Sequence, residues 1–146
     1  MHPFKNIDLS QLSQRFNTYS DDRGNLTVAD FSQIKLPFTP QRVFWIYGIP
    51  PQAERGGHAN RKCCELVIAL KGSFRLWLSD GENHAEYTLN HPQDGVYIPP
   101  MVWCELTDFS PESICLCIAD QPYNTSDYIN EYHDFIKERR DEVTAI

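Results

Sequence analysis

The sequence predicts a mostly-β fold, a jelly-roll barrel or sandwich that ends in one short helix. Runs of strand-forming residues follow one another between residues 42 and 119, at intervals of roughly ten residues. Turn residues separate the runs, and Asp80-Gly81 is a strong hairpin signal. Only the C-terminal segment has apolar residues at helical spacing. Short, evenly spaced strands of this kind are typical of antiparallel sandwiches and small barrels.

The expected elements can be placed in order along the chain. The strands are RVFWIYG (42–48), CCELVIALKG (63–72), SFRLWLS (73–79), AEYTLN (85–90), GVYIPP (95–100), MVWCELTDF (101–109) and SICLCIAD (113–120). In the third of these, Phe74, Leu76 and Leu78 fall on one side, which is expected to face the core. The helix is expected over about 126–140.

This helix has both a start signal and an apolar face. Ser126 or Asp127 is the expected N-cap, because a short polar side chain there accepts a hydrogen bond from the first turn. The aromatic residues that would share the buried face, at spacings of four and three, are Tyr128, Tyr132 and Phe135.

Length and composition limit the classes of protein. A chain of 146 residues is one domain's worth, 1–146, and its net charge of −7 argues against binding to nucleic acid. No secretory signal or membrane-spanning run is visible. Of the five cysteines, Cys63 and Cys64 are adjacent, and Cys115 and Cys117 should share one strand face. Such a pattern suits buried thiols in a reducing compartment, so we expect a cytoplasmic protein.

The segment RGGHANRKCCELVIALKG, residues 55–72, combines polar and apolar features of a strand. If 58–70 is one strand, His58 and Asn60 share a face and Glu65 takes the opposite one. Glu65 would then have a packing or dimer role unless a bulge turns it inward. The residues of 66–70 are apolar on both faces, which predicts burial by the barrel interior on one side and a partner surface on the other.

The spacing in this segment resembles the first metal motif of the cupin superfamily, His-x-His, then Glu, then Gly. Here the positions hold His58, Asn60, Glu65 and Gly72. The second cupin motif, Pro-x-Gly-x-x-His, reads PPMVWC, with Cys104 in place of its histidine. Asparagine is a poor ligand for transition metals, and this set suits no common coordination geometry. We therefore expect a cupin fold without a metal.

Five further segments resemble one family more specifically. They are DDRGNL (21–26), ERGGHANRK (54–62), LKGSFRLWLSDG (70–81), GVYIPPMVWCELTDFSPES (95–113) and YNTSDYINEYHDF (123–135). In order and spacing, over roughly residues 15–136, they resemble the bacterial dTDP-4-keto-6-deoxy-D-glucose 3,4-ketoisomerases. The resemblance implies a metal-independent isomerase without a cofactor, which moves the carbonyl of a dTDP-linked 4-keto-6-deoxyhexose from C4 to C3. It also implies a role in deoxysugar biosynthesis, as for lipopolysaccharide O-antigen, and a homodimer that exchanges N-terminal strands within 1–40.

Two positions depart from the pattern of that family. Its typical motif, Arg-Gly-x-His-Ala-His-Lys, carries two histidines that are the proposed acid/base pair; the first matches His58, but the second is Asn60. Cys104 stands where members of the family carry histidine or arginine, a choice that influences product stereochemistry. These departures leave the C4 configuration of the product open.

The chemistry of a 4-keto sugar points to particular residues. Removal of the C3 proton gives an enediolate and needs a base of near-neutral pKa, and His58 is the candidate. Asn60 cannot relay a proton but can donate a hydrogen bond to an enediolate oxygen, which allows a one-base mechanism. Tyr97 is either the partner acid or a packed strand tyrosine.

Substrate binding is assigned by charge and by the resemblance. Guanidinium and ammonium groups suit a diphosphate, and aromatic or small residues near the motif suit the pocket wall. The predicted binding residues are Arg23 and Arg55 by motif match, Arg61 and Lys62 by proximity, and Trp103 and Cys104 beside the second motif. Trp103 either lines the pocket or fills the barrel. Two other functions remain open, a non-catalytic sugar-nucleotide-binding cupin and a metal-dependent cupin enzyme.

Overall fold

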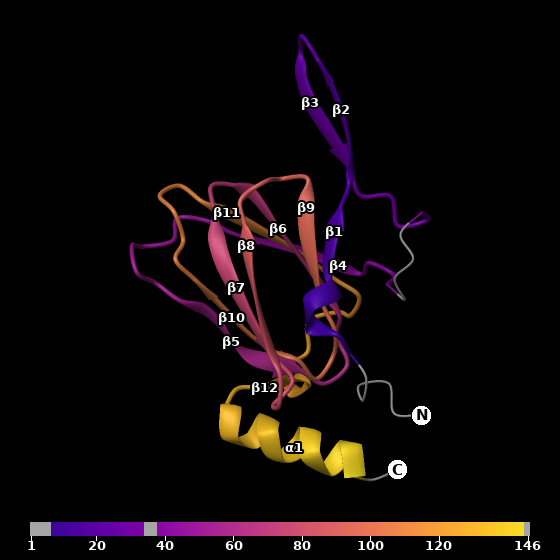
Figure 1. Ribbon diagram of the computed structural model, residues 1–146, viewed down its shortest axis with the longest axis vertical. Coiled ribbons are helices and arrows are strands. Elements are labelled where there is room, and N and C mark those ends of the chain that lie inside the picture. The colour runs from indigo at the N-terminus through magenta and orange to yellow at the C-terminus, as the bar shows by residue number, and fades with distance from the viewer. Residues whose placement is uncertain (1–6, 34–37, 145–146) are drawn as a thin grey trace.

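Two five-stranded antiparallel sheets pack face to face in the computed structural model, which describes residues 7–33 and 38–144 (Figure 1). The first sheet contains, in spatial order, β1 (Ser13–Arg15), β9 (Asp94–Ile98), β6 (Glu65–Lys71), β11 (Ile114–Ala119) and β4 (Arg42–Ile46). The second contains β12 (Tyr128–Ile129), β5 (Arg55–Asn60), β10 (Trp103–Thr107), β7 (Phe74–Ser79) and β8 (His84–Leu89). The mostly-β prediction is confirmed, and each expected strand is present.

The remaining elements are short or lie outside the sandwich. They are the 3₁₀ turns η1 (Leu9–Gln11) and η2 (Thr125–Asp127), the hairpin strands β2 (Asn17–Asp21) and β3 (Gly24–Val28), and the helix α1 (Tyr132–Thr144). Two parts of the N-terminal region predicted to be exchanged, residues 1–6 and 34–37, lie outside the described residues. No helix of the described chain is long and apolar enough to cross a membrane.

The space between the two sheets is filled by alternate residues of each strand. Phe74, Leu76 and Leu78 of β7 are at most 1% exposed and face this interior, as their alternation predicts. Cys115 and Cys117 of β11 share the interior face of the other sheet, with their sulfur atoms 3.8 Å apart. Their common face was also predicted, and all five cysteines are free thiols.

Helix α1 packs against the outer face of the second sheet at one end of the sandwich (Figure 1). Ala59 of β5 and Trp103 of β10 form a buried cluster there with Ile129 of β12 and Phe135 of α1, which is fully buried. The prediction of a helix over 126–140 is wrong at its start, because residues 128 and 129 form β12 and pair with β5 at the edge of the sheet. The helix begins only at Tyr132, beyond that pairing.

The turn before β12 also differs from the prediction. Ser126 and Asp127, the predicted N-caps of the helix, lie inside the 3₁₀ turn η2 instead, and Asn124 caps that turn through its side-chain oxygen, which accepts a hydrogen bond from the Ser126 backbone amide at 3.1 Å. Asp127 is left free to hold the neighbouring loop.

Residues that precede β4 form an N-terminal segment, which packs through Leu12, Phe16 and Phe38 on the outer face of the first sheet. Leu12, Phe16 and Phe38 belong to the same buried cluster as Leu66 and Ile68 of β6. The outer side of β6 is therefore buried largely by the chain's own N-terminal part, where the sequence pattern predicted a partner surface. Leu70, at the far end of the strand, stays 45% exposed.

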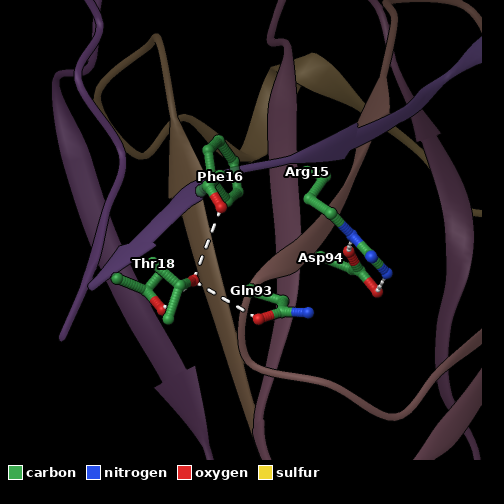
Figure 2. Close-up of polar contacts among 6 residues, drawn as sticks. Arg15, Phe16, Thr18, Gln93 and Asp94 are labelled. Atoms are coloured by element: carbon green, nitrogen blue, oxygen red, sulfur yellow. Dashed lines mark hydrogen bonds and ion pairs between the residues drawn. The ribbon is translucent and has the colours of Figure 1, made fainter. Parts of the chain in front are cut away.

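Paired side chains fasten this segment to the edge of the sheet. Figure 2 shows the Arg15 guanidinium against the Asp94 carboxylate, with nitrogen–oxygen distances of 2.8 and 3.0 Å. Beside them, the Thr18 hydroxyl lies 3.3 Å from the Gln93 side-chain oxygen, and the Phe16 backbone amide donates to the Gln93 carbonyl. Beyond this attachment the β2–β3 hairpin projects away from the sandwich (Figure 1).

Candidate active site

The predicted single strand over 58–70 is two strands in different sheets. β5 ends at Asn60, the chain turns at Arg61 and Lys62, and β6 begins at Glu65 in the opposite sheet. Asp127 holds this crossover, because its carboxylate accepts hydrogen bonds from the backbone amides of Lys62 at 2.8 Å and Cys63 at 3.2 Å. The face of each residue after the crossover therefore cannot be counted from His58.

Glu65 is the residue for which the crossover matters most. Its ladder partners are Ala119 and Ile98, which places its side chain on the interior face of the first sheet rather than on an outer face. It is only 7% exposed. Burial is the main cause that raises the pKa of its carboxyl to about 7; Arg42 opposes the rise, and Asp127 and Asp120 add to it. The expected placement of Glu65 on the opposite face is thus wrong, because the chain changes sheet between His58 and Glu65.

His58 faces the same interior from the second sheet. It pairs with Cys104 across the β5–β10 ladder, and its ring makes an edge contact with the Tyr128 ring, with centroids 5.0 Å apart. Burial lowers the pKa of the imidazole below 6.5, against the opposing effect of the Gly56 backbone. The imidazole is therefore neutral at pH 7 and able to accept a proton.

Cys104 forms the wall beside His58. It is 4% exposed, and burial is the main cause that raises the pKa of its thiol, with the charge of Glu65 adding to the effect. A thiol in this state stays protonated and is a poor nucleophile. Its contribution to the site is a small, uncharged surface.

The Asn60 side chain points to Asp127. Its amide nitrogen donates to the Asp127 carboxylate at 3.1 Å, and the residue is 7% exposed. Asn60 and the backbone amides of the crossover thus share one carboxylate. The structure gives Asn60 a role in holding the loop after β5.

Sequence reasoning missed Arg42 and Tyr128, both of which lie at this end of the sandwich. Arg42 of β4 pairs with Ala119, the ladder partner of Glu65, and it interacts electrostatically with Tyr128 and with Glu65. Its guanidinium also lies over the Tyr123 ring, 5.6 Å from the centroid. The sequence signal was the arginine that opens RVFWIYG, but only the pairing of β4 with β11 shows what it faces.

Three of the predicted site residues lie elsewhere. Tyr97 is on the outer face of β9, beneath the N-terminal segment, and its hydroxyl donates to the Cys64 sulfur at 3.1 Å. Trp103 lies beneath α1, on the face of β10 opposite Cys104. Arg23 lies in the turn of the β2–β3 hairpin, paired with Asp21 at 2.6 Å. The structure does not bring these side chains to His58 of the same chain.

The other three predicted cations lie close to His58 in the chain. Arg55 is exposed on β5, and Lys62 is exposed in the crossover. Arg61 is engaged in structural contacts, because it donates to the Glu138 carboxylate at 2.9 Å and to the Ser126 carbonyl at 2.6 Å. Arg55 and Lys62 are thus the cations free to meet a ligand beside β5.

The side chains around His58 are poorly suited to bind a metal ion. Among residues 7–33 and 38–144, no group of three or more histidine, cysteine, aspartate or glutamate side chains is arranged to hold a metal ion. Asn60 occupies one position of the cupin motif and is bonded to Asp127. The arrangement instead places a neutral imidazole and a buried carboxyl on the two facing sheets, which is suited to proton transfer.

Comparisons with known proteins show the family of the chain. A family model described as "FdtA: WxcM-like, C-terminal" matches residues 6–140. The chain is 35% identical over 122 residues to the TDP-4-oxo-6-deoxy-α-D-glucose-3,4-oxoisomerase of Aneurinibacillus thermoaerophilus, with 84% of this chain and 87% of that protein covered.

Solved structures show the same relationship. A 3,4-ketoisomerase from Helicobacter canadensis superposes with a TM-score of 0.84 and 31% identity, covering 88% of this chain and 96% of the other. The sugar 3,4-ketoisomerase QdtA from Thermoanaerobacterium thermosaccharolyticum, in complex with TDP, gives a TM-score of 0.83 and 32% identity, covering 88% and 93%. Sequence, fold and motif order therefore agree that this chain belongs to the FdtA, WxcM-like family of sugar 3,4-ketoisomerases.

Proposed function

We propose that this chain is a sugar-nucleotide 3,4-ketoisomerase that moves the carbonyl of dTDP-4-keto-6-deoxy-D-glucose from C4 to C3. The observation that carries the proposal is His58, a partly buried, neutral imidazole that faces the sandwich interior in a family of 3,4-ketoisomerases. The relative from Aneurinibacillus thermoaerophilus, which is 35% identical to this chain over 122 residues, is named for the same reaction. The product would serve deoxysugar biosynthesis, such as that of lipopolysaccharide O-antigen.

The mechanism begins with His58. Its neutral imidazole removes the proton at C3 of the sugar, and the electron pair moves to O4 to give an enediolate. The resulting imidazolium returns the proton to C4, while a proton passes from O3 to O4. One base can make both carbon transfers, because C3 and C4 are adjacent on the ring.

The negative charge that develops on O4 of the enediolate needs a hydrogen-bond donor or a cation close by. Asn60 gives its amide to Asp127, which leaves Arg42 as the better candidate at this end of the sandwich. Arg55 and Lys62, exposed beside His58, suit the diphosphate of the nucleotide. A dTDP ligand is supported by QdtA, which was solved with TDP. We propose no metal and no cofactor for this reaction.

The assembly we propose is a homodimer in which the N-terminal hairpin reaches the partner. Arg23 lies in the turn of this hairpin, far from the sandwich of its own chain (Figure 1). Only a neighbouring subunit would bring Arg23 to a substrate. The aromatic outer face of β4, with Trp45 59% exposed and Tyr47 70% exposed, offers such a subunit an apolar surface. Five free, buried cysteines suit a reducing cytoplasm.

The decisive experiment is incubation of the purified protein with dTDP-4-keto-6-deoxyglucose, followed by NMR of the product. We expect a new 3-keto signal and a proton at C4, whose configuration the coupling constants give directly. Unchanged substrate after prolonged incubation would contradict the proposal.

A second function is favoured by Asn60, whose side chain is bonded to Asp127 and cannot relay a proton. In that case the chain would be a cupin that binds the sugar nucleotide without converting it. Calorimetric titration with dTDP, combined with the turnover assay, separates the two functions. Binding without turnover would support the non-catalytic protein, and binding with turnover would support the isomerase.

A further inference from the structure

A buried carboxyl remains without a role in the mechanism given above. Glu65 opens β6, directly after the chain has crossed from one sheet to the other, and its side chain enters the interior between them. Its neighbours across the ladders, Ala119 and Ile98, are apolar and buried. An ionised carboxylate at such a position is costly unless it is compensated or used.

Two separate sets of contacts bring Glu65 and His58 to the same end of the sandwich. Cys104 lies directly opposite His58 in the β5–β10 ladder, and its thiol responds to the charge of Glu65. On the other side, the Tyr128 ring packs against His58 and interacts with Arg42, which in turn interacts with Glu65. The imidazole comes from one sheet and the carboxyl from the other, so the two side chains enter the interior from opposite sides at the same end of the sandwich.

The titratable groups around Glu65 come from six parts of the chain. The groups that interact with it are Arg42 of β4, Cys63 of the crossover, Cys104 of β10, Cys117 of β11, Asp120 after β11 and Asp127 of η2. A single cation faces two carboxylates in this set, so Arg42 does not fully compensate Glu65. Together with burial, this raises the pKa of the Glu65 carboxyl from its ordinary 4.5 to about 7. A group in that range gives up and recovers a proton readily at neutral pH.

We propose that Glu65 is the second proton-transferring residue of the isomerisation and exchanges protons with the oxygens of the sugar while His58 exchanges them with its carbons. This inference rests on the proposed ketoisomerase function and extends it. It places the second acid/base group on β6 of the facing sheet, at the start of the strand that follows the crossover.

The proton transfers balance. In the first half, the Glu65 carboxylic acid donates its proton to O4 while His58 removes the proton from C3, which gives a neutral enediol. In the second half, the Glu65 carboxylate takes the proton from O3 while the His58 imidazolium delivers its proton to C4. The carbonyl is then at C3, a hydroxyl is at C4, and both residues have regained their starting states without an oxidant or a reductant.

The test is the variant Glu65→Gln, which keeps the size of the side chain but cannot exchange a proton. We expect kcat to fall by about 100-fold or more, the usual range for a lost general acid or base. The affinity for dTDP, measured by calorimetry, should change by less than about threefold, because the nucleotide contacts lie elsewhere. Glu65→Asp, which retains an acid on a shorter arm, should recover part of the activity.

The pH profile tells a proton-transfer role from a structural one. Glu65 must start protonated and His58 must start neutral. Wild-type kcat/KM should therefore fall above pH 7 as Glu65 ionises, and fall again in acidic solution as His58, whose pKa burial lowers, becomes charged. In Glu65→Gln the alkaline fall should disappear and the acidic fall should remain.

Folding is checked in the same variant. Because the folded state raises the Glu65 pKa, the stability that the neutral carboxyl contributes is lost as the pH rises through about 7. Glu65→Gln should accordingly unfold at a higher temperature than wild type at pH 8. A loss of turnover in a variant of raised Tm cannot come from unfolding. Glu112→Gln, at a side chain that is 81% exposed, is the matched control and should leave kcat unchanged.

The outcomes separate this inference from the function on which it rests. If wild type does not convert the substrate, the ketoisomerase function itself is wrong. If wild type converts it and Glu65→Gln keeps kcat within about twofold, or keeps the alkaline fall of the pH profile, the role of Glu65 is wrong while the function stands.

Discussion

Two polar side chains two residues apart on β5 meet different environments. His58 lies against Tyr128 and Cys104, where desolvation favours its neutral form. Asn60 instead donates to Asp127 and helps to hold the turn into β6. His58 is therefore placed for proton transfer, and Asn60 is placed to stabilise the turn into β6. A histidine at position 60 would face the same Asp127 carboxylate. Asparagine keeps a hydrogen bond to that carboxylate but cannot transfer a proton.

The role of His58 as the base can be tested by His58→Asn. We expect turnover to fall by about 10²- to 10⁴-fold, because the amide cannot accept the C3 proton. Affinity for dTDP should be largely kept. Product formation is followed by NMR and binding by calorimetry, and His133→Asn, at an exposed position of α1, serves as the control. An active His58→Asn would remove His58 from the mechanism.

Asp127 is the residue whose loss should most affect the crossover. Asp127→Ala removes the acceptor for the Lys62 and Cys63 amides and for the Asn60 side chain. We expect the free energy of unfolding to fall by about 1–3 kcal/mol, because the partners lose hydrogen bonds in a half-buried place. Urea titration measures this change. Asp22→Ala in the exposed hairpin turn should change stability by less than about 0.5 kcal/mol, and an equal effect of both would contradict the account.

At the scale of elements, patterns within one strand were predictable and the switch between sheets was not. The alternation of Phe74, Leu76 and Leu78 and the Asp80-Gly81 turn describe the β7–β8 hairpin correctly. The crossover at Arg61 and Lys62 carries no glycine or proline, and a carboxylate far along the chain, Asp127, holds it. Long-range support of this kind leaves no local signal in the sequence.

The same holds for the candidate site, where residues in local motifs were predictable and residues placed by the pairing of the sheets were not. His58 and Cys104 were found because each lies in a motif, and their ladder places them side by side. Glu65 was placed on the wrong face because alternation was counted through the crossover. Arg42 was missed because its partners come from β6 and β12, whose positions depend on the pairing of the sheets.

Helix α1 should matter for stability through one side chain above all. Phe135 is fully buried against Trp103 and Tyr132, so Phe135→Ala should lower the free energy of unfolding by about 3–5 kcal/mol. Thermal and urea unfolding measure the loss. On the same helix, the exposed Lys137→Ala should cost less than about 0.5 kcal/mol. A small effect of Phe135→Ala would mean that α1 is not an integral part of the fold.

At the scale of the whole molecule, the outer faces of the two sheets are covered unequally. Helix α1 packs against one end of the second sheet, and the N-terminal segment packs on the first sheet over β6 and β9. The outer side of β4 is left open, with Val43 52% exposed and Trp45 59% exposed. The β2–β3 hairpin, also rich in exposed apolar residues, extends into solvent beside this sheet (Figure 1). Both features are explained if a second copy of the chain completes the structure.

The proposed homodimer makes a prediction for Trp45→Glu. A charge placed on an apolar interface must be desolvated without a partner, so the variant should dissociate. Its fold should be kept, because Trp45 is 59% exposed in its own chain. Light scattering coupled to size exclusion should give twice 16.9 kDa for wild type and a monomer mass for Trp45→Glu. Circular dichroism should be the same for both. Turnover should fall with dissociation if the partner's hairpin contributes Arg23 to the site.

The control for this variant is Thr88→Glu, an equivalent change at an exposed position of β8 in the other sheet. It should leave both mass and turnover unchanged. A wild-type protein that is monomeric at micromolar concentration would contradict the dimer. A dimer that survives Trp45→Glu would mean instead that β4 is not its interface, because an uncompensated buried carboxylate costs several kcal/mol across two symmetric copies.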